Sequence, residues 1–345
     1  MKNTMWGWGL GAVALAVLCG CAEKKPTLHI YTWSDYVKPE LVQRFEAENG
    51  CRVVIDTFDS NEAMYAKLKA GATGYDLLFP SSYMVQIMHD QGMLRKLDHA
   101  LLPNRKNVDP AYLAMAVDRE MDHSVPYTVT ITCLGVLGSK VDNAEPSWAM
   151  FDRADLKGRM TLLNDHRETI GAALKFLGYS LNTLDPAELA AAKDVVLRWK
   201  KNVAKFENEQ YKTGLASGEF LLTHGYSGDL MLVRSENADI QIAVPREGTA
   251  LSFDDMVIPA TARQVELAHK FIDFVLDPAV AAELTEYIYF LCPNAASYER
   301  LSAEIRSDPI LFPPPDVVAK LEMIGDLGEN NRAYTKLWDE IKAGD

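Results

Sequence analysis

The sequence predicts an α/β protein of two domains. In the first third of the chain, segments that alternate apolar and polar residues, as strands do, are followed by segments with the spacing of amphipathic helices. This regular succession predicts a parallel sheet with helices on its faces. The second half continues the succession without repeating the sequence. At 345 residues the chain also exceeds the size at which one hydrophobic core stops growing, so a second domain is expected.

Three strands and three helices are predicted before residue 100. Pro39 suits the first position of a helix, and Gly50 suits the position just beyond its end. Asp59 or Ser60 is a suitable N-cap for the next helix, which Gly71 ends. The predicted strands are 27–33, 52–58 and 75–80, and the predicted helices are 39–50, 59–71 and 83–92.

Helix starts are the clearest local signals in the second half. Asp185 and Pro186 combine an N-cap with a proline at the first helical position, and Asp277 and Pro278 do the same. The apolar residues of 263–276 fall on one helical face. The predicted strands are 159–164, 219–224 and 239–245; the predicted helices are 168–178, one from 185, 263–276 and one from 277; a proline-rich loop covers 307–315 and helices follow to the end.

The N-terminus has the features of a secretion signal. Lys2 precedes an apolar run over 10–18, which is shorter than the roughly 20 residues that span a bilayer. A transmembrane anchor with two incidental cysteines is therefore disfavoured. The motif LCGC (18–21) resembles the lipobox of bacterial lipoproteins, in which the chain is cut before the last cysteine and that cysteine is acylated. The resemblance implies a signal peptide over 1–20, a tether over 21–26, and a lipid on Cys21 that holds the protein to a periplasm-facing bacterial membrane.

Charge and cysteine usage exclude several classes of partner. The net charge is −13 and no basic run suits phosphate contacts, so nucleic acid is not an expected partner. Cys51, Cys133 and Cys292 stand among aliphatic neighbours and are predicted to be core residues. No pair of cysteines has the spacing of a zinc site, and no metal is predicted.

No motif of catalysis is complete. Residues 225–228 (GYSG) resemble a nucleophile elbow, but the fifth position is Asp229 instead of glycine. There is no phosphate-binding loop and no dinucleotide fingerprint. The histidines lack paired spacing, and His224 and His269 are predicted to be surface or hydrogen-bonded core residues. We therefore expect no enzyme activity, no catalytic residue and no cofactor.

Six segments carry a resemblance to the solute-binding proteins of bacterial ABC importers, closest to the spermidine/putrescine-binding (PotD/PotF-like) family. They are IYTWSDYV (30–37), DSNEAMYAKL (59–68), YDLLFPSSYMV (75–85), LLNDHRE (162–168), FDDMVIP (253–259) and KAG (342–344). The first three together are specific, and the resemblance covers nearly the whole chain after the signal. It implies a type II periplasmic-binding-protein fold, in which two α/β lobes enclose a ligand cleft and are joined by a hinge. The expected lobes are 27–131 with 254–299 and 135–250 with 302–345, joined by crossovers at 132–134 and 251–253.

The resemblance also implies a polyamine site. A polyamine needs carboxylates spaced along a trough, because each desolvated ammonium must regain its hydrogen bonds, and it needs aromatic faces for its methylenes. Several candidate residues follow predicted strands, where α/β sheets bind ligands. The expected ligand-binding residues are Trp33, Ser34, Asp35, Tyr36, Ser81, Tyr83, Asp165, Glu168, Tyr226 and Asp254.

Each of these residues also has a structural interpretation. Trp33 and Tyr36 suit a core, Asp165 suits a helix N-cap with Glu168 favouring the helix dipole, and Asp254 suits a turn. Their joint occurrence at three strand ends, in both halves of the chain, favours a binding site.

The candidate cleft departs from the family pattern at three positions. Tyr226 replaces a tryptophan, Ser252 or Phe253 replaces a second tryptophan, and Ile324 falls on or near a glutamine of spermidine binders. The preference between spermidine and putrescine is therefore open. The expected partners are a polyamine and the permease subunits of an ABC importer, with a monomeric binding protein.

The alternatives are a binding protein for another cationic solute, thiamine or iron, or a sensor or adhesin lipoprotein that uses the same fold without transport. Tyr287 and Tyr289 are the only sequence hint of an iron site.

Overall fold

The structure is a computed structural model that describes residues 25–344. The predicted signal peptide and Cys21 lie outside these residues. Within 25–344, every helix is too short or too polar to cross a membrane.

One path of hydrogen-bonded strands runs through the whole protein. The order is β2-β1-β3-β9-β4-β7-β5-β6, with β10 paired to β9 and β8 paired to β4. The strands are β1 (Thr27–Thr32), β2 (Arg52–Thr57), β3 (Leu77–Leu78), β4 (Ser124–Leu137), β5 (Met160–Leu162), β6 (Lys205–Phe206), β7 (Leu222–Tyr226), β8 (Ile240–Ala243), β9 (Ala250–Val257) and β10 (Glu322–Met323).

Helices cover both ends of this path. They are α1 (Pro39–Asn49), α2 (Asn61–Lys69), α3 (Ser82–Asp90), α4 (Pro110–Leu113), α5 (His166–Phe176), α6 (Pro186–Lys200), α7 (Gln210–Ser217), α8 (Ser227–Glu236), α9 (Val265–Val275), α10 (Pro278–Ile288), α11 (Ala303–Arg306), α12 (Pro315–Val318) and α13 (Asn331–Ala343). Each strand and helix predicted with both bounds has a counterpart, with most boundaries shifted by one to three residues. The elements β4, β6, β9, α7 and α8 were not predicted. Ser60 is the N-cap of α2, and its side chain accepts from the N–H of Ala63.

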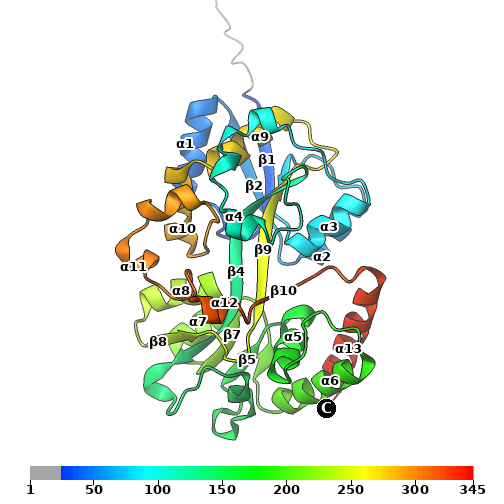
Figure 1. Cartoon of the computed structure of the whole chain (residues 1–345), viewed down its shortest axis with the longest axis vertical. Helices are drawn as coiled ribbons and strands as arrows, with labels where there is room; N and C mark the ends of the chain where they lie inside the picture. The colour runs from blue at the N-terminus through cyan, green and yellow to red at the C-terminus, as the bar shows by residue number, and fades with distance from the viewer. Residues whose placement is uncertain (1–24, 345) are drawn as a thin grey trace, which may run out of the picture.

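Two long strands join the ends of the molecule. Figure 1 shows β4 and β9 running side by side along the long axis, with α1 and α9 above and α5, α6 and α13 below. We call β1–β3 with α1–α3, α9 and α10 the upper part, and β5–β8 with α5–α8 and α13 the lower part. β4 pairs with β9 up to Ile131, and from Thr132 onward it pairs with β7. This one strand therefore belongs to the sheets of both parts.

The upper and lower parts have separate hydrophobic cores. The upper core gathers side chains of β1, α1, α9 and α10, including Phe45 and Phe271. The lower core gathers side chains of α5, α6 and α13, including Trp199 and Trp338. A third cluster lies along β4 and β9 between them. Cys51, Cys133 and Cys292 are buried and free, which confirms that they are core residues.

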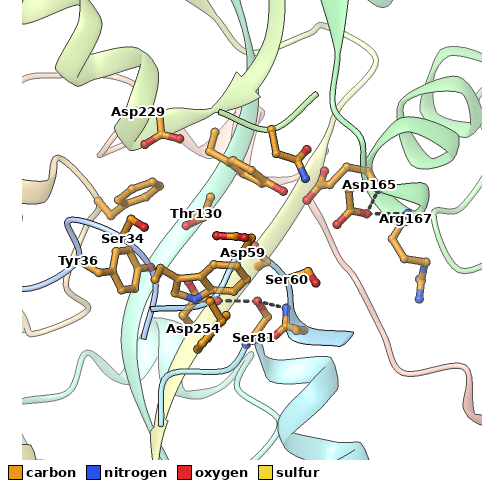
Figure 2. A pocket seen from close by; sticks show the side chains of 18 of the residues that line it. Ser34, Tyr36, Asp59, Ser60, Ser81, Thr130, Asp165, Arg167, Asp229 and Asp254 are labelled. Carbon is orange, nitrogen blue, oxygen red and sulfur yellow. Dashed lines mark hydrogen bonds between the residues drawn. The ribbon is translucent and has the colours of Figure 1, made fainter. Parts of the chain in front are cut away.

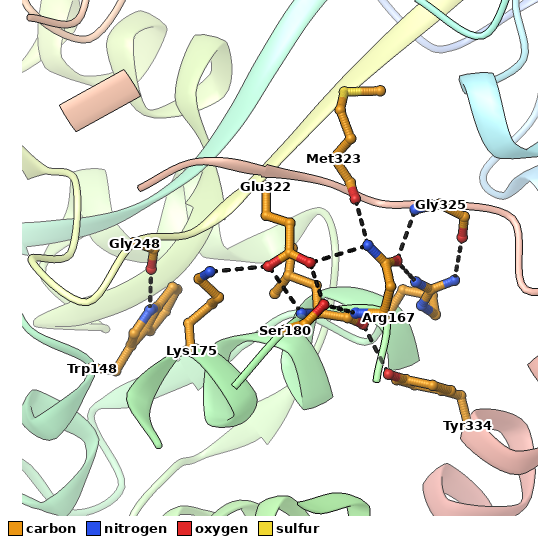
Figure 3. A network of polar contacts seen from close by, with 11 residues as sticks. Trp148, Arg167, Lys175, Ser180, Gly248, Glu322, Met323, Gly325 and Tyr334 are labelled. Atoms are coloured by element: carbon orange, nitrogen blue, oxygen red, sulfur yellow. Dashed lines mark hydrogen bonds and ion pairs between the residues drawn. The ribbon is translucent and has the colours of Figure 1, made fainter. Parts of the chain in front are cut away.

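The segment before the C-terminal helix differs from the prediction of continuous helix. After α12 the chain is extended and adds β10 beside β9. Glu322 holds it there, because its carboxylate accepts from Lys175 Nζ at 3.0 Å and from the N–H of Leu181 at 3.1 Å (Figure 3). Arg167 donates to the carbonyl of Gly325 at 2.9 Å. These polar contacts join residues that are far apart in sequence, so they could not be predicted from a local sequence pattern.

The two core histidines differ. His269 is hydrogen-bonded as expected: Nε2 accepts from the N–H of Asp98, so Nδ1 donates to the Val265 carbonyl. His224 is fully buried without a hydrogen-bond partner for either nitrogen within 25–344, which corrects the expectation. It packs edge-on against Trp148, and burial lowers its pKa to about 3, so the ring is neutral.

Candidate ligand-binding cleft

A cavity of about 390 Å³ opens beside the crossing of β4 and β9. It is bounded by the carboxyl ends of two sets of parallel strands, β1–β3 in the upper part and β5 and β7 in the lower part. Loops that follow such strand ends are where open α/β sheets bind ligands. All ten residues predicted from the sequence line this one cavity. Their role in binding stays a prediction, but the structure brings every one of them together.

Asp254 forms the centre of the upper wall. It lies on β9, and its carboxylate accepts from Tyr36 Oη at 2.5 Å and from Ser81 Oγ at 2.6 Å. Tyr36 also shares a 2.6 Å hydrogen bond with Thr128 Oγ1 on β4. Burial raises the pKa of Asp254 to about 6, against the two hydrogen bonds, which favour the charged form. The carboxylate is thus held by neutral hydroxyl donors and keeps its negative charge available.

The polar and aromatic residues around Asp254 are fixed by their own contacts. Asn61 donates to Ser81 Oγ and accepts from the Ser81 N–H, both at 3.0 Å, which ties α2 to the loop before α3. Trp33 donates through Nε1 to the Phe79 carbonyl at 2.9 Å, and its ring packs on Phe58 with a centroid distance of 4.4 Å. The wall is therefore ordered before any ligand arrives.

Tyr36 is part of the hydrophobic core as well as of the cavity wall. It is buried and packs edge-on against Tyr127 and Phe290 in the upper core, while its hydroxyl still faces Asp254. Trp33 is half-buried and faces the cavity. The side chain of Tyr36 thus packs in the core with its ring and lines the cavity with its hydroxyl group.

The lower wall carries Asp165 and Glu168 at the start of α5. Asp165 is the N-cap of this helix and accepts from the N–H groups of Arg167 and Glu168, as its structural interpretation predicted. It lines the cavity as well, and Figure 2 shows its carboxylate directed toward the cavity. Glu168 is 5% exposed and accepts from Thr132 Oγ1 on β4 at 3.1 Å. Burial, with Asp165 close by, raises the pKa of Glu168 to about 8, so the empty site holds it mostly protonated at neutral pH.

Two tyrosines face the space between these acids. Tyr83 at the start of α3 donates to Glu62 Oε1 at 3.0 Å. Tyr226 ends β7, and its N–H donates to Tyr211 Oη at 3.2 Å. Their rings come from the upper and lower parts, so the cavity has an aromatic surface on each side.

Comparisons with known proteins agree with this architecture. Residues 40–313 match the family of bacterial extracellular solute-binding proteins. The chain is 37% identical over 336 residues to the spermidine/putrescine-binding periplasmic protein of Escherichia coli K12, and the match covers 97% of each chain. The chain belongs to this family, in its spermidine/putrescine-binding branch. It is a binding protein and not an enzyme.

Solved structures confirm the fold of the solute-binding protein. A putative spermidine/putrescine ABC transporter protein from Listeria monocytogenes superposes with a TM-score of 0.87 at 36% identity, covering 92% of this chain and 99% of that one. The PotD lipoprotein of Treponema pallidum superposes with a TM-score of 0.83 at 32% identity, covering 91% and 99%. The type II periplasmic-binding-protein fold expected from the sequence is therefore correct.

The cleft of this solute-binding protein also contains charged residues that the sequence analysis missed. They are Asp59, Glu62, Arg167, Glu209, Lys212 and Asp229, together with the amides Asn61, Asn164 and Asn208. The sequence analysis noted Asp229 only because it stands where a nucleophile elbow has glycine. A signal was present: it stands three residues after Tyr226, at the start of a helix that follows a strand, as Glu168 stands three residues after Asp165.

Strand register separates the faces on which Ser252 and Phe253 lie. Side chains two apart on a strand share a face, so Ser252 lies on the side of Asp254. Phe253 is fully buried in the cluster along β4 and β9. Ser252, Phe253 and Ile324 all line the cavity, so the structure leaves open whether Ser252 or Phe253 takes the place of the tryptophan.

Proposed function

We propose that this protein captures a polyamine in the cleft and delivers it to an ABC importer. The observation that carries the proposal is the opposition of acids across an aromatic cavity: Asp254 on the upper wall, Asp165 and Glu168 on the lower wall. Ammonium groups separated by methylenes match carboxylates separated by aromatic rings. The names of the relatives, which describe spermidine and putrescine binding, agree with this chemistry.

Each predicted residue has a role in this proposal. One ammonium group binds Asp254, beside Ser34, Asp35 and Ser81. A second binds Asp165 and Glu168, where Glu168 loses its proton as the ligand cation arrives. The methylenes between them lie against Trp33, Tyr36, Tyr83 and Tyr226, where each cation–aromatic contact adds about 0.5–2 kcal/mol.

The proposed mechanism of capture is closure of two lobes. The proposed lobes keep the bounds predicted from the sequence, 27–131 with 254–299 and 135–250 with 302–345, and the proposed hinge lies on β4 and β9. The change of partner of β4 between Ile131 and Thr132 supports a bend at this point. Closing brings both walls onto the ligand and excludes water, and the closed form is what the permease recognises.

Calorimetric titration tests the ligand. Spermidine or putrescine should bind in the micromolar range or tighter, which corresponds to about −8 kcal/mol or more. Heat from sulfate or a neutral sugar, with none from either polyamine, would contradict the proposal. Heat from thiamine alone would show that the cleft binds a cationic solute other than a polyamine.

The protein is further proposed to be a monomeric, lipid-anchored component of the periplasm. The LCGC motif supports acylation of Cys21, and the Treponema pallidum relative is named a lipoprotein. Acylation by more than one chain is needed for stable anchoring. Cys21→Ser should move the protein from the detergent phase to the aqueous phase in phase separation. A variant that stays in the detergent phase would show that Cys21 does not carry the anchor.

A further inference from the structure

Lys212 places a cation inside the acidic cleft. It lies on α7 and lines the cavity. Its Nζ is 2.9 Å from Glu209 Oε2 and 3.8 Å from Asp229 Oδ1, and its side chain is 28% exposed. A cleft that must attract a cationic ligand therefore contains an ammonium group of its own.

Asp229 is the acid that this ammonium group faces. Its side chain accepts from Tyr211 Oη at 2.5 Å, and Figure 2 shows it on the opposite side of the cavity from Asp165. Burial lowers the pKa of Lys212, but the charges of Asp229, Glu209 and Asp35 outweigh burial and leave the pKa raised. Lys212 is therefore charged at neutral pH, and its positive charge offsets the negative charges of Asp229 and Glu209.

Asp165, Glu168 and Asp254 have no such partner. Among residues 25–344, no lysine or arginine forms an ion pair with Asp165, Glu168 or Asp254. Arg167 stands next to this pair, but its guanidinium donates to the Gly325 carbonyl and Asn182 Oδ1 instead. The positions of Asp254 and of the Asp165 and Glu168 pair are thus open to ligand ammonium groups, whereas Lys212 occupies the position beside Asp229.

We propose that Lys212 is a specificity-determining residue that shortens the site by filling its Asp229 end with a tethered ammonium. This inference rests on the proposed polyamine-binding function. A diamine that pairs with Asp254 at one end and with Asp165 and Glu168 at the other does not need the Asp229 position. A longer triamine carries a third ammonium group toward Asp229, where it meets the like charge of Lys212, which already pairs with Asp229 and Glu209. Putrescine is therefore favoured over spermidine.

The test is the ratio of spermidine to putrescine affinity, measured by calorimetry on the full chain. Lys212→Met keeps the length of the side chain and removes its charge. It should raise the affinity for spermidine at least tenfold relative to putrescine, and Lys212→Gln should shift the ratio the same way. Lys193→Met is the matched control, because Lys193 pairs with Glu340 on the exposed surface of α6 and α13. It removes the same charge away from the cleft and should leave the ratio unchanged.

Three outcomes overturn the inference in different ways. An unchanged ratio in both Lys212 variants shows that Lys212 does not select for length. An equal gain for both polyamines shows that it acts only as a general positive charge. Wild-type protein that binds neither polyamine overturns the proposed function and this inference together, so the two failures are distinguishable.

Discussion

The two acidic walls of the cleft are built in different ways. Asp254 is held on a strand by two hydroxyl donors, Tyr36 and Ser81, and its pKa rises only to about 6. Glu168 is held on a helix with a single hydroxyl donor, Thr132, and a neighbouring acid, and its pKa rises to about 8. Asp254 therefore offers a charge in advance, whereas Glu168 acquires its charge when a cation binds. Glu168 is the more buried of the two, and the charge of Asp165 raises its pKa further, whereas Asp254 has one more hydroxyl donor and no such neighbour.

The preformed charge should give the largest effect on affinity. Asp254→Asn keeps the shape and an acceptor for Ser81 but leaves a ligand ammonium group without its counter-charge. We expect polyamine affinity to fall by about 2–5 kcal/mol, as at other buried charge pairs. Titration measures the affinity, and the melting temperature of the empty protein should change little. Unchanged affinity would place the ligand elsewhere in the cleft.

The switchable charge should appear as pH dependence. The ligand binds the ionised form of Glu168, so binding should release a proton, and affinity should rise about tenfold or more between pH 6 and pH 8. Titrations in buffers of different ionisation enthalpy count the released protons. Above pH 8.5 the ligand's own amines begin to lose their protons, so the measurement stays below it.

Glu168→Gln is the control for this pH dependence. It should bind weakly at every pH and release no proton at this position. In the empty wild type the raised pKa of Glu168 means that the folded state holds its proton longer than the unfolded state does, so its contribution to stability falls as pH rises from about 4.5 toward 8. Glu168→Gln should therefore melt higher than wild type at pH 8 and close to it at pH 4. Wild-type affinity that does not vary between pH 6 and pH 8 would show that Glu168 is ionised in the empty site.

The smallest effect separates the two roles of Asp165. Asp165→Ala removes the N-cap of α5 and should lower the stability of the empty protein by about 1 kcal/mol. Asp165→Asn keeps the cap and removes only the charge, so it should weaken polyamine binding with little change in melting temperature. Denaturant titration with calorimetry on both variants measures the two quantities. Normal affinity in Asp165→Asn would show that Asp165 acts only as a helix N-cap. Glu168 alone would then bind the ligand ammonium group on the lower wall.

Local sequence patterns were enough to predict many of the helix starts and strands of this protein. N-caps, helix-opening prolines and alternating strands have their causes within a few residues, so Ser60, Asp185 and Asp277 could be identified as helix starts from spacing alone. The resemblance to the polyamine-binding family named ten candidate residues, and the fold brings all of them into one cavity.

Tertiary structure decided what depends on partners far along the chain. β4 was not predicted because it is buried along its whole length and lacks the alternation of a half-exposed strand. The pairing of Lys212 with Asp229 joins two helices, and the register of β9 placed Ser252 in the cleft. The raised pKa of Glu168 comes from burial beneath both walls, and burial exists only in the folded chain. Sequence determined which groups are available; folding determined which of them keep a charge.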